Sequence, residues 1–158
     1  GLIAVNNTTG ANYTATNTSG GTYTIEGEHT GLIIGVPYES KYTLSPQYVR
    51  EAAGNGVIAI TSGRYQIRTI SFDYENSGFF QVEVTPETRD PYTTIMNGYV
   101  VGFSGNVDTP ALSSGTLVVP VQSRNTQFTL NIKSSSHLPM FIPSAEVEGY
   151  YHRRSKRI

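Results

Sequence analysis

Three pairs of carboxylates are the side chains best suited to catalysis in this 158-residue chain. Each pair has one residue between its members: Glu26 and Glu28, Asp73 and Glu75, and Glu146 and Glu148. On a strand the two residues of such a pair share a face, with their Cα atoms about 6.5–7 Å apart. This spacing fits the carboxyl separation of an inverting glycosidase. Alternating acidic residues are also typical of a solvent-facing strand, and we favour that interpretation over an enzyme.

Other catalytic or metal-binding patterns are missing from the sequence. His29, His137 and His152 lie far apart, and there is no Cys to supply a thiolate ligand or a disulfide. The chain contains no nucleophile elbow, no phosphate-binding glycine loop and no zinc-protease motif. We therefore expect no catalytic residue, no metal site and no cofactor. No apolar run approaches the roughly 20 residues that span a bilayer.

The last ten residues, 149–158, combine aromatic rings with dense positive charge. Without their four basic residues, the chain carries seven Lys and Arg against twelve Asp and Glu, a net charge of −5. Such a basic segment needs an acidic partner or remains in solvent. The sequence predicts assembly contacts at six of these residues: Tyr150, Tyr151, Arg153, Arg154, Lys156 and Arg157.

The composition favours strands over helices. Gly, Thr, Ser, Asn and Tyr are abundant, Trp is absent, and only 15% of the residues are charged. The eleven tyrosines suit protein interfaces or, as a second option, a carbohydrate-binding surface. The fold class that we expect is all-β, an antiparallel sandwich or barrel of the jelly-roll kind, and the sequence leaves sandwich and barrel open.

The chain divides at about residue 29. Residues 6–22 are nearly free of apolar side chains, so we expect residues 1–29 to form a long polar loop or linker with one strand at 22–26. Residues 30–158 are expected to form a β-domain. Residues 46–53 are the one candidate for a short helix. Because the chain opens without Met, it stays open whether the chain is part of a longer protein with a larger preceding region.

The clearest strand runs from Arg64 to Tyr74, with Ile70, Phe72 and Tyr74 on one face and Ile67 on the other. A Gly-containing turn at 75–78 precedes a second strand at 79–84, and the two are expected to pair as a hairpin. Further strands are expected at about 32–36, 38–44, 95–103, 116–121, 126–132 and 145–153.

The order of three motifs resembles the C-terminal region of the tail tubular protein B family, the nozzle proteins of short-tailed, podovirus-type phages. The motifs are Gly35-Val36-Pro37-Tyr38 before a Tyr-rich strand, the strand from Arg64-Tyr65-Gln66-Ile67-Arg68 to its Ser77-Gly78 turn, and the C-terminal Glu148-Gly149-Tyr150-Tyr151-His152-Arg153-Arg154-Ser155. The resemblance covers roughly residues 30–158. Family members are several times longer, so the chain is similar to a C-terminal fragment or a stand-alone relative.

The resemblance implies a structural protein of the virion tail rather than an enzyme. It implies a hexameric ring below the portal and an adaptor of the tail tubular protein A kind, a tube that retains and conducts DNA during ejection, and an outer surface that docks tail fibres. The alternatives are a carbohydrate- or receptor-binding β-module of a viral tail and, less favoured, a tail-associated glycan hydrolase. The host, the fibre partner, the copy number, and whether the basic tail contacts protein or DNA stay open.

Overall fold

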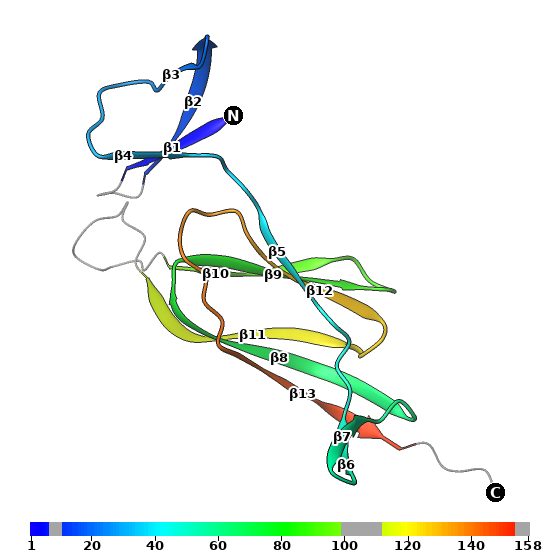
Figure 1. The fold of residues 1–158 in the computed structure, drawn as a ribbon. Coiled ribbons are helices and arrows are strands. Elements are labelled where there is room, and N and C mark those ends of the chain that lie inside the picture. Colours follow the sequence, from blue (N-terminus) through cyan, green and yellow to red (C-terminus); the bar gives the residue numbers. More distant parts are fainter. Residues whose placement is uncertain (7–10, 99–111, 154–158) are drawn as a thin grey trace, which may run out of the picture.

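Strands make up all the regular structure in the computed structural model, which describes residues 1–6, 11–98 and 112–153. Within these ranges no helix is present (Figure 1). The strands are β1 (Leu2–Asn6), β2 (Asn12–Ser19), β3 (Thr22–Thr24), β4 (Leu32–Gly35), β5 (Ser40–Leu44), β6 (Arg50–Ala53), β7 (Gly56–Ala59), β8 (Arg64–Ser77), β9 (Phe79–Pro86), β10 (Tyr92–Asn97), β11 (Ser113–Arg124), β12 (Phe128–Ser134) and β13 (Ser144–His152).

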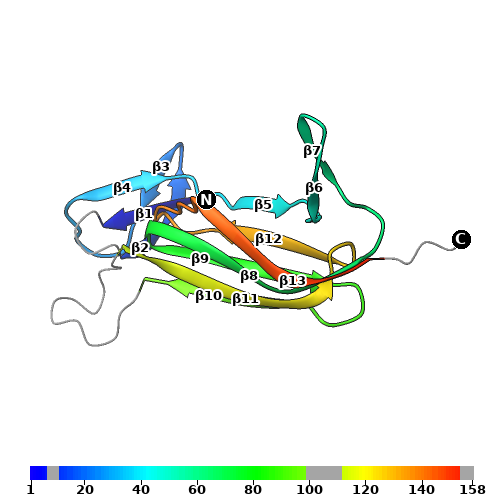
Figure 2. The same ribbon diagram turned by 90° about the horizontal axis from the view of Figure 1, so that it is seen from below.

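Two antiparallel sheets pack face to face as a sandwich. One sheet has the order β10-β9-β12-β5, and the other has the order β11-β8-β13. They lie one above the other in Figure 1 and overlap in Figure 2, which is seen from below. Their facing side chains form one hydrophobic core: Ile67, Ile70, Phe72, Phe80, Val82, Val84, Met96, Val119, Val121, Leu130 and Ile132. The all-β, antiparallel prediction is therefore confirmed, and its sandwich form is the one observed.

Strand β9 shows the sequence logic most simply. Phe80, Val82 and Val84 are fully buried, while the residues between them are partly exposed, because successive side chains of a strand point to opposite faces. The expected strands at 116–121, 126–132 and 145–153 correspond to β11, β12 and β13, within a few residues at each end. The expected strand at 95–103 corresponds to β10 as far as Asn97, and its end lies outside the described residues.

Strand β8 departs from simple alternation at Arg68. Ile67 and Ile70 are both fully buried, although the sequence pattern placed Ile67 on the face opposite to Ile70. Glu148 pairs with Thr69 and the next residue, Gly149, pairs with Ile67, so Arg68 is an extra residue of β8 at this point. The bulge shifts the alternation of side chains between the two faces of β8 by one residue, so the Ile67 side chain points into the core.

The expected hairpin between residues 64–74 and 79–84 is wrong in its pairing. A single residue, Gly78, separates β8 from β9, yet the two strands belong to opposite sheets. A Cβ at Gly78 would lie 2.6 Å from the Cβ of Leu138, so no side chain fits at this corner. A chain that turns between layers leaves both strands free to pair with other strands: β11 and β13 for β8, and β10 and β12 for β9.

A third sheet of four short strands, which we call the small sheet, contains much of the segment that was expected to be a polar loop. Its strand order is β3-β2-β1-β4, with Ala4, Val5 and Ala15 buried. The polar residues of β2 are strand residues because β1 and β3 supply their hydrogen-bond partners, a tertiary effect that composition does not reveal. Since β4 pairs with β1, this sheet extends past residue 29. The division of the chain into two domains at that residue stays a prediction.

The short helix considered at residues 46–53 does not form. Arg50–Ala53 is strand β6, and it pairs with β7 as a two-stranded hairpin whose turn is Gly54-Asn55. Gly54 has a φ of 60°, a conformation that glycine adopts readily and that suits a two-residue hairpin turn. The hairpin stands apart from the sandwich in Figure 2, near the C-terminal end of β13.

Candidate functional site

The carboxylate pairs do not have the environment of a catalytic acid. Asp73 accepts hydrogen bonds from the hydroxyls of Ser144, at 2.6 Å, and Thr116, at 2.8 Å. These bonds stabilise the charged form and lower the pKa of Asp73 below its ordinary value. A general acid at neutral pH needs a raised pKa, so Asp73 is shifted in the opposite direction. Its hydroxyl partners come from β11 and β13, and the carboxylate links these strands across β8.

The remaining members of these pairs lie on the surface. Glu148 lies 3.4 Å from a guanidinium nitrogen of Arg68 and accepts a hydrogen bond from the hydroxyl of Thr69 at 3.2 Å. Glu26, Glu28, Glu75 and Glu146 are exposed. Among the residues that the structure describes, no group of three His, Asp or Glu side chains could hold a metal ion, and no helix could cross a membrane.

The two C-terminal tyrosines differ in their surroundings. Tyr150 is exposed, with 59% of its surface accessible. Tyr151 is half-buried, and its hydroxyl donates a hydrogen bond of 2.6 Å to the carbonyl oxygen of Ser62. Tyr151 thus ties the end of β13 to the connector between β7 and β8. Of the two rings predicted to make assembly contacts, the one that faces outward is Tyr150.

Gly63 makes the contact between Tyr151 and the connector possible. Its φ is 126°, a backbone conformation that residues with a side chain rarely adopt. A Cβ at this position would lie 2.7 Å from the Tyr151 hydroxyl and 2.9 Å from the carbonyl oxygen of His152. The connector can therefore lie against β13 only because position 63 has no side chain.

The charged end of β13 reaches toward the β6–β7 hairpin. A guanidinium nitrogen of Arg153 lies 3.7 Å from a carboxylate oxygen of Glu51, and both side chains are more than half exposed. Exposed pairs of this kind contribute little to stability, so Arg153 remains available to a partner. Arg154, Lys156 and Arg157, the other predicted contacts, lie outside the described residues.

An open pocket of about 510 Å³ lies beside these residues, and we call it the basic pocket. Its lining comes from the β7–β8 connector and the ends of three strands: Thr61, Ser62, Gly63, Arg64, Arg124, His152 and Arg153. Arg64, Arg124 and His152 could not be recognised in the sequence as members of one site, because they are separated by up to 88 residues. The pairing of β8 with both β11 and β13 brings these residues together. That pairing is known only once the fold is known.

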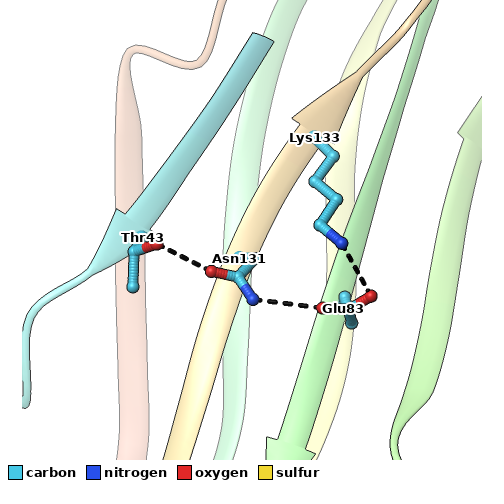
Figure 3. A network of polar contacts seen from close by, with 4 residues as sticks. All are labelled: Thr43, Glu83, Asn131 and Lys133. Atoms are coloured by element: carbon cyan, nitrogen blue, oxygen red, sulfur yellow. Dashed lines mark hydrogen bonds and ion pairs between the residues drawn. The ribbon is translucent and has the colours of Figure 1, made fainter. Parts of the chain in front are cut away.

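A chain of polar contacts crosses three strands of the sheet β10-β9-β12-β5 (Figure 3). The Thr43 hydroxyl donates to the Asn131 side-chain oxygen at 2.7 Å, and the Asn131 amide donates to Glu83 at 3.1 Å. Lys133 donates to the other Glu83 oxygen at 2.8 Å. Hydrogen bonds from Lys133 and Asn131 lower the pKa of Glu83, and the bond to Glu83 raises the pKa of Lys133. The network connects β5, β12 and β9 and fixes β5 at the edge of the sheet.

Large apolar side chains are exposed in several regions of the surface, and two of these regions lie near the hairpin and the edge strand β5. Val57 and Ile58 of the β6–β7 hairpin are both more than half exposed. Tyr38 and Tyr42, before and within the edge strand β5, are 77% and 60% exposed. Apolar side chains on a projecting hairpin and along an edge strand are typical of surfaces that contact other proteins.

Comparison with known proteins places the chain by its sequence. A family model described as bacteriophage nozzle protein matches residues 2–158, which is nearly the whole chain. A comparison with curated protein sequences found no match. The family match also includes β1, β2 and β3, which the resemblance found in the sequence, at residues 30–158, did not cover.

Proposed function

The chain belongs to the bacteriophage nozzle protein family, whose members are components of the virion tail, and we propose that it works there by assembly into a ring. The ring lies below an adaptor of the tail tubular protein A kind. It retains DNA before ejection, conducts DNA during ejection, and docks tail fibres on its outer surface. The family match over residues 2–158 is the observation that carries this proposal.

The surface of the molecule supports an assembling protein rather than an enzyme. Among the carboxylates of the three candidate pairs, Asp73 accepts two hydrogen bonds from side chains, and its pKa is lowered. The exposed residues that stand out are instead tyrosines, apolar residues of a hairpin and arginines. These residue types are enriched in protein interfaces. We propose Tyr150, Arg153, Arg154, Lys156 and Arg157 as assembly contacts, with Tyr151 fixing the strand that presents them.

Light scattering on the full chain, alone and mixed with the adaptor, tests the proposal. We expect a mass of several copies, or a complex with the adaptor, and a loss of that species when residues 153–158 are deleted. A monomer that ignores the adaptor at every concentration would overturn the proposal.

Charge reversal at the start of the basic segment tests its role. We expect Arg153→Glu with Arg154→Glu to weaken ring or adaptor assembly at least about tenfold, because like charges across an interface cost several kcal/mol. Thermal unfolding of the variant should match the wild type, since Arg153 is exposed. Unchanged assembly would exclude these two residues as contacts.

A carbohydrate- or receptor-binding role is the second candidate, and the exposure of Tyr38 and Tyr42 favours it. Tyrosine rings can stack against sugars as well as against protein. Binding of surface polysaccharide from bacterial cells, lost in Tyr38→Ala with Tyr42→Ala while the mass in light scattering is unchanged, would support this role over ring assembly.

A further inference from the structure

The basic pocket has more cationic groups than counter-charges. Among the residues that the structure describes, its lining includes three arginines and one histidine but no carboxylate. Of the three arginines, only Arg153 takes part in an ion pair within the described part of the chain. The Nε atom of Arg124 is buried and has no hydrogen-bond partner among the described residues. The same holds for the Oε1 atom of Gln66, which is opposite Arg124 in the sheet. Arg124 is therefore an unpaired cation that is partly removed from water, and such a group favours an anion in the pocket.

The donors in the pocket suit an oxyanion with two or more oxygens. Guanidinium groups bind carboxylates and phosphates through paired N–H donors, and Thr61 and Ser62 add hydroxyl donors at the rim. The basic residues Arg154, Lys156 and Arg157 follow directly in the sequence. The positive charge of the pocket residues therefore continues along the sequence toward the C-terminus.

The opposite end of the molecule is acidic. The first 40 residues contain three Glu and no Lys or Arg. Two of these, Glu26 and Glu28, lie in the loop between β3 and β4, and both are exposed. Neither belongs to an ion pair among the described residues. In Figures 1 and 2 the small sheet and the C-terminal end of β13 lie at opposite ends of the molecule.

The acidic loop has a defined shape. The Nε2 atom of His29 donates a hydrogen bond of 2.7 Å to the carbonyl oxygen of Glu26, and its ring contacts Tyr13 at a centroid distance of 4.1 Å. Gly27, between the two glutamates, has a φ of 91°. A loop held in this way loses less conformational entropy when it binds than a free segment would.

We propose that the basic pocket binds the loop 25–31 of a second copy of the chain, with the carboxylates of Glu26 and Glu28 against Arg64, Arg124 and Arg153. The inference rests on the proposed assembly of the chain and names its contact. The pocket and the loop are different surfaces at opposite ends, so the contact is head to tail. Contacts of this type form a closed ring when the rotation between copies closes.

DNA phosphate is a weaker match for the pocket than a carboxylate of another copy. A protein that follows a duplex needs an extended basic surface, but the chain without its basic tail carries a net charge of −5. That negative body would repel a duplex beyond the pocket, whereas a second copy offers a short acidic loop.

Two charge-reversed variants and their mixture test the contact by light scattering on the full chain. Glu26→Arg with Glu28→Arg reverses the loop, and Arg64→Glu with Arg153→Glu reverses exposed residues of the pocket. Each variant alone should assemble at least about tenfold more weakly than the wild type. An equimolar mixture should assemble again, because each copy then meets a partner of opposite charge. The control, Glu75→Arg with Glu87→Arg, makes the same charge change on exposed residues outside the loop and should assemble like the wild type.

The possible failures have different meanings. If the wild type assembles and both reversed variants assemble equally well, the pocket–loop contact is wrong and the ring remains. If the wild type stays a monomer with and without the adaptor, the proposed ring function fails, and this contact with it. If Arg64→Glu with Arg153→Glu keeps assembly but loses binding to a short DNA duplex, phosphate occupies the pocket and the inference is overturned. Thermal unfolding of each variant establishes that it is folded.

Discussion

At the scale of single residues, Tyr151 joins the last strand to the connector that begins the three-stranded sheet. Its hydroxyl bonds to Ser62, and its ring lies against Gly63, so the position of β13 depends on two residues far away in the sequence. Tyr150, the preceding residue, faces solvent. The pair separates a structural tyrosine from one that is free to contact a partner.

Replacing each tyrosine by phenylalanine tests this difference. We expect Tyr151→Phe to lower the free energy of unfolding by about 1 kcal/mol, because it removes one hydrogen bond to a carbonyl oxygen. Tyr150→Phe is the matched control and should leave the free energy of unfolding unchanged within about 0.5 kcal/mol. Urea unfolding measures both, and equal effects would contradict the assignment.

Gly63→Ala should be costly for two reasons. The φ of 126° is strained for alanine, and the new Cβ would approach the Tyr151 hydroxyl to 2.7 Å. We expect a loss of about 1–3 kcal/mol in the free energy of unfolding. Gly35→Ala is the control, because a Cβ there meets no atom within 4 Å, and it should have little effect. A neutral Gly63→Ala would mean that the connector does not need its observed conformation.

At the scale of elements, the polar network fixes the edge strand β5 to the interior of its sheet. Glu83 on β9 and Lys133 on β12 are partly buried, and Asn131 between them relays the contact to Thr43 on β5. A charge pair in such a position responds to pH more than an exposed pair does. The network therefore predicts a pH dependence that can be assigned to one residue.

Glu83→Gln measures that dependence. The pKa of Glu83 is lowered in the folded state, so its stabilisation is complete above the unfolded value of about 4.3 and is lost as the pH falls through the folded value. The pKa of Lys133 is raised, so its stabilisation is complete below the unfolded value of about 10.4 and is lost as the pH rises through the folded value. We expect the wild type to exceed Glu83→Gln in free energy of unfolding between about pH 5 and 10, and the difference to shrink outside that window.

Urea unfolding across pH 3 to 8 supplies the acid side of this measurement. Glu87→Gln, a change on an exposed carboxylate, serves as the control and should follow the wild type at every pH. A constant difference between wild type and Glu83→Gln down to pH 3 would show that the charge pair is not the source.

The β6–β7 hairpin is the other element whose independence can be tested. All eight strand residues of the hairpin are exposed, and a two-stranded hairpin is marginally stable alone. We expect Val57→Ser with Ile58→Ser to change the free energy of unfolding by less than about 0.5 kcal/mol. In hydrogen exchange on the monomer, its amides should exchange faster than those of β8. Equal protection in the two elements would show that the hairpin packs on the sandwich.

At the scale of the whole molecule, local patterns predicted the strands and long-range pairing decided the rest. Alternation in β9 was readable because this strand has one buried face. The pairing of β8 was not, since the corner at Gly78 looks in sequence like a hairpin turn. The polar strand β2 was missed because its neighbours, not its residue types, hold it in a sheet. The basic pocket could not be predicted for the same reason, while the contacts at Tyr150 and Arg153 stay predictions from the local sequence of the last ten residues.

The corner at Gly78 also bears on how fast the chain reaches its native state. Because β8 and β9 do not pair with each other, β8 closes its sheet with β13 and β5 closes the other with β12, both across 70 or more residues. Such pairings bring distant segments together before local contacts can compensate for the lost loop entropy. We expect refolding from urea, followed by tyrosine fluorescence in stopped flow, to take milliseconds to seconds rather than microseconds. During that interval the unpaired edges of β8 and β9 are exposed to other chains, so the yield of refolding should fall as protein concentration rises.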